Sequence, residues 1–462
     1  MNQQKQIAVI GAGISGLSAA YWLQRQGHAV TVFEKATRPG GSIVTEKKDG
    51  FLIDYGPNST LETSDVLRDL VRDLGLEGQK VYANAAAAKR YVVKQSMLHA
   101  LPMSPLKFLT TQLFSTGAKL RLLREPFIPP SQDPEISLAD LVRYRLGKEF
   151  LDYAINPFVA GVYAGNPETL SAAAAFPKLV ALEQEYGSFI KGALLGARAR
   201  KQRKEVAKDR ARLFSFVDGM QTLPAALANQ LGDRLILGAE ITKIGQAQNG
   251  FVLEGAGNAP SQSRFDQVIL ATPTPALAQL LQNLAPAAAA QIAQISYSPV
   301  AVVFMGFKAA DVSRPLDGFG FLVPAVEQRQ ILGSIWSSTI FPGRAPNGHA
   351  AFTTFVGGAR QPALVDLPDE QLQQRVYGDL QTLVGLRGAP VCVHIRRWPK
   401  AIPQYTVGYR KFQQLFTEIE KAVPGLYFAG NFRRGISIGD SVLCAHETVQ
   451  KMQGIVARGE AE

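Results

Sequence analysis

The stretch Gly11-Ala-Gly-Ile-Ser-Gly16 has the glycine spacing of a loop that binds the phosphates of a dinucleotide. Gly11 allows a tight turn, Gly13 lets backbone N–H groups approach a pyrophosphate, and Gly16 lets the next helix pack on the preceding strand. That helix would begin at Ile14 and Ser15, and its N-terminus carries the partial positive charge that stabilises a phosphate.

An acidic residue and a second pair of glycines extend this loop. Glu34 lies 23 positions after Gly11 and can accept hydrogen bonds from ribose hydroxyls, which disfavours a 2′-phosphate. The segment continues with Lys35, Arg38, Gly40 and Gly41. An arginine and two glycines at this point can extend the pyrophosphate cradle toward a flavin, an element that NAD enzymes do not need. The spacing resembles the extended fingerprint of flavin-dependent amine oxidases.

Further candidate cofactor residues lie far from this loop. They are Gly56, Pro57 and Asn58, then Ala271 after a strand-like segment, and Gly430, Ile438 and Asp440 near the C-terminus. The C-terminal group resembles the closing FAD element of the same superfamily, in which backbone near the chain end meets the flavin. Two distant flavin elements in the expected order predict FAD, bound without a covalent link.

A second pattern suggests different chemistry. Residues 435–439 read Gly-Ile-Ser-Ile-Gly, which fits the G-x-S-x-G elbow of serine hydrolases, with Asp440 and His446 nearby. A true elbow lies directly between a strand and a helix and takes its acid and base from later, separate loops, so a hydrolase is disfavoured. Cys392 and Cys444 are far apart and no histidines cluster at metal-ligand spacing, so neither a disulfide framework nor a metal site is predicted.

The elements that position these residues follow from apolar patterning. Residues 7–10 predict a buried strand, 17–26 a helix and 28–33 a second strand, which together form a βαβ unit. Residues 96–212 show a mostly helical pattern. Strands are predicted again at 234–237, 251–254, 266–270, 300–307, 319–323, 331–336, 351–356 and 426–428, before a final helix from about Ser441.

Composition limits the class of protein. The 462 residues are 46% apolar and 19% charged, which is typical of a chain of several globular domains. No stretch reaches the ~18–20 apolar residues that a membrane-spanning helix needs, and no secretory signal precedes the first strand. The net charge is +11, and residues 191–212 hold nine Lys or Arg against two acids. This run predicts either a solvated helix face or a patch for anionic lipid. No motif predicts binding to nucleic acid.

Motifs outside the flavin elements narrow the family. Residues 157–165 (Pro-Phe-Val-Ala-Gly-Val-Tyr-Ala-Gly), 318–324 (Gly-Phe-Gly-Phe-Leu-Val-Pro) and 353–358 (Thr-Thr-Phe-Val-Gly-Gly) resemble those of oxygen-dependent protoporphyrinogen oxidases, in the same order along the whole chain. By position, the resemblance implies that Arg90 binds a substrate propionate, for which a guanidinium is suited. It also implies that Leu322, Ile335 and Phe355 hold the tetrapyrrole, with the backbone of Ala164 and Gly165 close to substrate and flavin. From their pattern alone, the three apolar residues read as ordinary strand core.

The resemblance implies an α/β fold class, α+β overall, with three domains. A Rossmann-like FAD-binding domain would be built from the discontinuous segments 1–85, 213–295 and 396–462. A mixed-sheet substrate domain would comprise 86–95 and 296–395, and 96–212 would form a helical domain that docks on a membrane.

The activity implied is oxidation of protoporphyrinogen IX to protoporphyrin IX with O₂, a six-electron reaction that releases three H₂O₂. The flavin carries the chemistry, so no catalytic side chain is predicted. A coproporphyrinogen III oxidase of the same family, another amine-oxidase-like flavoenzyme and an inactive tetrapyrrole-binding protein stay open as alternatives. The expected partners are the tetrapyrrole, O₂ and an anionic membrane surface, and a homodimer is left open. We expect a cytoplasmic protein associated peripherally with the cytoplasmic membrane.

Overall fold

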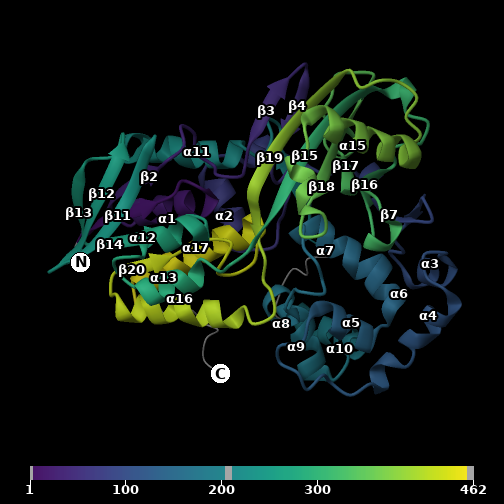
Figure 1. Cartoon of the computed structure of the whole chain (residues 1–462), viewed down its shortest axis with the longest axis horizontal. Helices are drawn as coiled ribbons and strands as arrows, with labels where there is room; N and C mark the ends of the chain where they lie inside the picture. The colour runs from purple at the N-terminus through teal and green to yellow at the C-terminus, as the bar shows by residue number, and fades with distance from the viewer. Residues whose placement is uncertain (1–3, 203–210, 455–462) are drawn as a thin grey trace.

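The computed structural model describes residues 4–202 and 211–454. It confirms the α/β fold class: a parallel sheet with its helices lies at the left of Figure 1, a mixed sheet at the upper right and a helical region at the lower right. Residues 203–210 of the basic run at 191–212 lie outside the described residues, so its two interpretations stay predictions.

The parallel sheet collects strands from distant parts of the chain. Its order is β10 (Leu235–Leu237), β2 (Ala29–Glu34), β1 (Gln6–Ile10), β14 (Gln267–Leu270) and β20 (Leu426–Phe428). Every neighbouring pair is parallel. β1 is apolar along almost its whole length because both faces of the sheet are covered by other elements.

Helices α1 (Ile14–Arg25), α11 (Thr222–Leu231) and α17 (Ile438–Met452) pack together against this sheet (Figure 1). The predicted helix at about Ser441 begins three residues earlier, because Ser437 caps it by accepting a hydrogen bond from the Asp440 N–H. The predicted strands of the βαβ unit and those at 234–237, 266–270 and 426–428 are confirmed to within a residue or two.

The mixed sheet has seven strands. Its order is β19 (Cys392–Pro403), β15 (Tyr297–Lys308), β18 (His349–Gly357), β17 (Ile331–Trp336), β16 (Gly318–Leu322), β7 (Lys89–Lys94) and β8 (Met97–Ala100). β16 and β7 run parallel, and the other pairs are antiparallel. Helix α15 (Asp369–Val384) covers one face with Leu372, Val376 and Leu380.

One prediction about this sheet is wrong. Residues 97–100 fall in the range predicted as helical, but they form β8, which pairs with β7 in a hairpin. The turn places Gln95 and Ser96 at positive φ, 51° and 61°. Neither residue type is typical of such a turn, which glycine and asparagine favour, so the hairpin leaves little trace in the sequence.

The helical prediction holds for most of the rest of this region. Its helices are α3 (Pro105–Thr110), α4 (Thr116–Leu122), α5 (Leu138–Arg145), α6 (Lys148–Phe150), α7 (Asn156–Tyr163), α8 (Ala172–Ala175), α9 (Pro177–Tyr186) and α10 (Phe189–Gln202). The fully buried Arg145 of α5 forms ion pairs with Glu183 of α9 (2.6 Å) and with Glu125 (3.1 Å), which lies between α4 and α5. Among the described residues, no helix combines the length and the apolarity needed to cross a bilayer.

Smaller elements connect these parts. The hairpin β3 (Thr45–Lys48) and β4 (Phe51–Asp54) lies beside β19, and β5 (Thr60–Leu61), β9 (Leu213–Phe216) and β6 (Lys80–Tyr82) form a short sheet. A three-stranded sheet of β11 (Ala239–Ala247), β12 (Gly250–Gly257) and β13 (Gln262–Phe265) covers the other side of the parallel sheet. Helices α2 (Asp65–Asp73), α12 (Thr274–Leu280), α13 (Pro286–Ile292) and α16 (Arg410–Ala422) complete the fold. The three-domain division stays a prediction.

Candidate functional site

The glycine loop has the steric properties that its spacing indicates. Gly11 has φ +104°, a conformation that favours glycine. A Cβ on Gly16 would lie 1.9 Å from the Gly11 carbonyl oxygen and 3.2 Å from Cβ of Ala271, which follows β14. A Cβ on Gly13 would meet nothing within 4 Å. Gly16 is therefore required for packing, whereas Gly13 borders open space that a ligand can use.

Glu34 lies beside this space at the end of β2. Its Oε2 accepts a hydrogen bond from the Ala12 N–H at 2.7 Å, and its Oε1 accepts one from the Ala36 N–H at 2.8 Å. Each oxygen keeps a second acceptor position, which fits ribose hydroxyls. Helix α1 begins at Ile14 and Ser15, and its N-cap Gly13 has no side chain to occupy the free N–H groups. The residues present therefore fit the phosphates and ribose of a dinucleotide.

The two cations near this loop have other partners. The Lys35 ammonium is largely exposed and pairs with Glu240 at 2.7 Å. The Arg38 guanidinium donates to the carbonyl oxygens of Pro39, Gly41 and Ile43, the shortest bond being 2.6 Å to Gly41. Burial lowers the pKa of Arg38. Arg38 thus shapes its own loop, whose Gly40 N–H donates to the Ala12 carbonyl, and contact of either cation with the cofactor stays a prediction.

A cavity of about 390 Å³ lies between the segment 42–63, α7, the mixed sheet and the start of α17. Seven residues predicted to bind cofactor or substrate line it: Gly56, Pro57, Asn58, Ala164, Ile335, Phe355 and Ile438. Nδ2 of Asn58 is buried and has no hydrogen-bond partner among the described residues. An orphaned amide donor at the wall of a cavity fits a ligand that accepts a hydrogen bond there.

The register of the mixed sheet brings the three predicted ring-holding residues onto one face. Leu322 on β16 lies opposite Gly333 on β17, and Gly333 lies opposite Phe355 on β18. Ile335 follows Gly333 by two positions, so its side chain points to the same face. Leu322 is not part of the cavity wall but packs beside it, because its Cδ2 would lie 2.4 Å from a Cβ on Gly161 of α7.

Other predicted residues lie outside the cavity wall. Arg90 is exposed on β7, and its guanidinium lies 5.6 Å from the centre of the Phe319 ring. Gly165 faces Gln404, and Gly430 lies beyond the cavity at the end of β20. Oδ2 of Asp440 accepts a hydrogen bond from the Ser437 hydroxyl, so this side chain helps to cap α17.

Sequence reasoning missed much of the cavity wall. Tyr55, Ala160, Gly161, Val300, Val302, Trp398, Ala401, Ile402 and Asn431 all line it. Some signal was available, because Ala160 and Gly161 fall in the family motif at 157–165 and Val300 and Val302 alternate along the predicted strand 300–307. The Trp398 indole N–H donates to the Tyr55 carbonyl at 2.7 Å, which joins β19 to the segment that carries Asn58.

The geometry agrees with the reasoning against a serine hydrolase. Ser437 lies nine residues after the end of β20, so no strand leads directly into it. Its hydroxyl is hydrogen-bonded to Asp440, whereas the His446 ring contacts Trp22 with ring centres 4.9 Å apart. Serine, acid and base therefore do not form a catalytic triad.

Comparisons with known proteins bear on the family and the fold. The model of the family described as flavin containing amine oxidoreductase matches residues 14–452. The mitochondrial protoporphyrinogen oxidase of Nicotiana tabacum is 35% identical over 95% of this chain and 92% of its own. The coproporphyrinogen III oxidase of Bacillus subtilis (strain 168) is 30% identical over 95% of this chain and 96% of its own. The crystal structure of a protein from Exiguobacterium sp. 255-15, assigned as a protoporphyrinogen oxidase, matches with a TM-score of 0.81 at 28% identity. The match covers 98% of this chain and 99% of that one.

Proposed function

The chain belongs to the flavin-containing amine oxidoreductases and has FAD as its cofactor, and within this family we propose that it oxidises protoporphyrinogen IX to protoporphyrin IX with O₂. Its relatives act on porphyrinogens that differ in the number of carboxylates they carry. The choice between the two substrates therefore depends on the charges that the site presents.

The observation that carries this choice is the chemistry of the cavity wall. Among the described residues, none that lines it is Lys, Arg, Asp or Glu. An apolar tetrapyrrole body gains free energy from burial there, whereas each carboxylate placed inside without a cation would cost several kcal/mol. Protoporphyrinogen has two carboxylates to direct toward the mouth of the cavity, and coproporphyrinogen has four. The cavity wall therefore favours protoporphyrinogen, the substrate with fewer carboxylates.

The chain's own residues bind and orient in this reaction. The N-terminus of α1, Glu34 and the space beside Gly13 would hold the dinucleotide part of FAD, and the ring would lie where Asn58 and Ile438 line the cavity. Bound FAD would supply the acceptor for a hydride from a methylene bridge of the porphyrinogen, and O₂ would take up the electrons, three times per substrate. Ile335 and Phe355, which line the cavity, would contact the macrocycle and exclude water, and Leu322 would support this wall from beside it.

Arg90 is available for a propionate. It is exposed, its guanidinium contacts the Phe319 ring and, within the described residues, it has no ion pair, so binding a carboxylate would break no existing ion pair. It lies on β7, two positions before Val92, whose partner across the strand pair is Leu322. A propionate that leaves the ring near Leu322 can therefore extend along β7 toward this guanidinium.

Peripheral docking on an anionic membrane is part of the proposal. Ten large apolar side chains are more than half exposed among the described residues, and nine of them lie between positions 97 and 195, led by Phe127 at 83% and Leu106 at 72%. Lys107 and Lys119 lie on the same short helices, α3 and α4. Apolar side chains that insert between lipids, with cations at headgroup level, would keep the protein on an anionic surface.

Turnover distinguishes the two substrates. Porphyrin fluorescence is followed in air with purified protein and either protoporphyrinogen or coproporphyrinogen, each corrected for autoxidation. We expect faster turnover of protoporphyrinogen. Faster turnover of coproporphyrinogen would assign the chain the other substrate, and rates at the level of autoxidation with both would refute porphyrinogen oxidation while leaving FAD binding intact.

Sedimentation with vesicles tests the docking surface. The protein should sediment with phosphatidylglycerol vesicles in a salt-sensitive way and less with phosphatidylcholine. Phe127→Glu combined with Leu106→Glu should abolish sedimentation, whereas Val391→Glu, at an exposed apolar residue outside this region, should not. Equal sedimentation of both variants would refute the proposed surface.

A further inference from the structure

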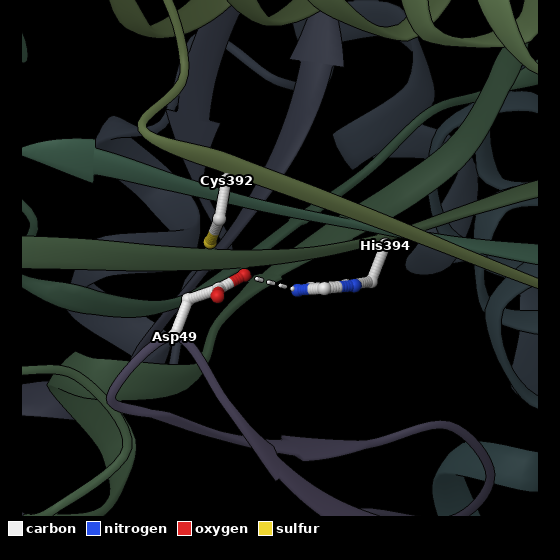
Figure 2. A group of neighbouring side chains, drawn as sticks. All are labelled: Asp49, Cys392 and His394. Carbon is white, nitrogen blue, oxygen red and sulfur yellow. Dashed lines mark hydrogen bonds and ion pairs between the residues drawn. The ribbon is translucent and has the colours of Figure 1, made fainter.

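Three potential metal ligands meet outside the cavity, where the β3–β4 turn reaches β19 (Figure 2). Asp49 belongs to the turn, and Cys392 and His394 belong to β19. The three side chains converge from two segments more than 340 positions apart, so spacing along the chain could not reveal them. The spacing of these residues along the chain therefore predicts no metal site.

The backbone explains why the side chains converge. Asp49 and Gly50 form the turn at positive φ, 49° and 79°, which carries the Asp49 carboxylate toward β19. Cys392 and His394 are two positions apart on one strand, so their side chains leave the same face. This face of β19 lies against the β3–β4 hairpin, as the contact of Arg396 with Glu46 also shows.

The distances suit a small cation. His394 Nε2 lies 2.9 Å from Asp49 Oδ2, and one ligand atom from each of the three residues lies within 4.8 Å of the others. Metal–ligand bonds of about 2.0–2.3 Å in a tetrahedral zinc site separate the ligand atoms by roughly 3–4 Å. Small side-chain movements therefore convert this cluster into a coordination shell.

The geometry points to a site for a borderline divalent cation of the zinc class, held by Cys392, His394 and Asp49. A thiolate and an imidazole exclude calcium and magnesium, which take oxygen ligands. The thiolate and the carboxylate together balance the charge of a divalent ion. Asp49 is 61% exposed, so a water can complete the fourth position.

Other uses of the cysteine fit less well. Reactive cysteines are partly exposed, whereas Cys392 is buried, so a role as a nucleophile is disfavoured. Cys444, the other cysteine, is buried against different elements, so the two form no disulfide.

Occupancy would tie the tip of the hairpin to the mixed sheet. The same hairpin leads into Tyr55, which lines the cavity and accepts the hydrogen bond from Trp398 of β19. A cation at the outer end would restrain two elements whose inner ends form the cavity wall. Since the cation binds the folded chain, it should raise the melting temperature.

Binding of Zn²⁺ to the untagged, FAD-loaded full chain, after dialysis against chelator, tests the site by calorimetry. We expect one equivalent to bind and the melting temperature to rise. Cys392→Ser, His394→Ala and Asp49→Asn should each weaken binding by at least about 100-fold, because changes outside the ligand shell alone cost 10–100-fold. Cys444→Ser and His349→Ala are matched controls that should bind as the wild type does.

Co²⁺ gives a second readout that identifies the ligand. Tetrahedral Co²⁺ should show ligand-field bands to the red of the flavin absorption and a thiolate charge-transfer band that Cys392→Ser removes. Retained flavin absorption shows that a variant is folded. Absence of Zn²⁺ binding in the wild type, or equal binding by the three ligand variants and the two controls, would overturn the assignment.

Discussion

Replacing Gly13 or Gly16 by alanine should have different consequences, although Gly13 caps α1 and Gly16 lies in its first turn. A Cβ on Gly16 would lie 1.9 Å from the Gly11 carbonyl oxygen, inside any tolerable contact. The loop and α1 would have to separate from the parallel sheet. Forced overpacking of this kind costs about 1–3 kcal/mol or more, so Gly16→Ala should lower the free energy of unfolding even without cofactor.

Gly13→Ala should leave the fold intact and act on the ligand. Gly13 has φ −69°, which alanine adopts freely, and its Cβ would meet no protein atom within 4 Å. As an N-cap, alanine is somewhat poorer than glycine, so the apo-protein should lose under about 1 kcal/mol. The new methyl group would occupy the space through which a pyrophosphate approaches the N–H groups of α1.

The expected change in the Kd for FAD follows from the hydrogen bonds that the new methyl group would prevent. A hydrogen bond to a charged group contributes about 1.5–3 kcal/mol, so loss of one bond to the pyrophosphate should raise the Kd for FAD about 10- to 150-fold. Flavin fluorescence titration of the apo-protein measures this Kd, and urea unfolding measures stability.

Gly378→Ala is the control for these two changes. Gly378 is exposed within α15 and a Cβ there would meet nothing within 4 Å, so alanine should stabilise the protein by about 1 kcal/mol and leave the Kd unchanged. An unchanged Kd for FAD in Gly13→Ala, or a large loss of stability in its apo-protein, would refute the reasoning.

Three further perturbations test separate features. Arg90→Ala should raise KM more than it lowers kcat in porphyrinogen turnover, because it removes a contact distant from the reacting carbon. Arg90→Lys should restore part of the affinity for substrate, and an unchanged KM in Arg90→Ala would contradict the binding of a propionate by Arg90. Arg145→Met should lower the free energy of unfolding by about 3–5 kcal/mol, since two buried glutamates lose their partner. Arg143→Ala, at a partly exposed arginine, should lower it by under about 1 kcal/mol, and equal effects in urea unfolding would refute the buried network. Burial raises the pKa of Glu149, but hydrogen bonds from Ser115 and the charged, hydrogen-bonded Lys94 together outweigh it, so the net pKa is lowered. The contribution of Glu149 to stability should therefore be present above the ordinary glutamate pKa and disappear as pH falls through the lowered value, so Glu149→Gln and wild type should converge in stability in acid and differ at neutral pH.

The sequence by itself determined the local elements and the cofactor class. The glycine spacing from Gly11 to Gly16 and the acidic Glu34 predict the nucleotide loop because each requirement is met within a few residues of backbone. Apolar runs predict most strands of both sheets, since burial on both faces leaves a continuous pattern. The β7–β8 hairpin was missed because Gln95 and Ser96 carry no turn signal.

Only the tertiary structure decided how residues far apart meet. Leu322, Ile335 and Phe355 share one face because three strands pair in a particular register, and a shift by one residue would turn each to the other face. Likewise, the Arg38 guanidinium is used by its own loop, and Asp49 reaches His394 across the hairpin. Such contacts depend on long-range pairing and on competing hydrogen-bond partners, and neither leaves a periodic pattern along the chain.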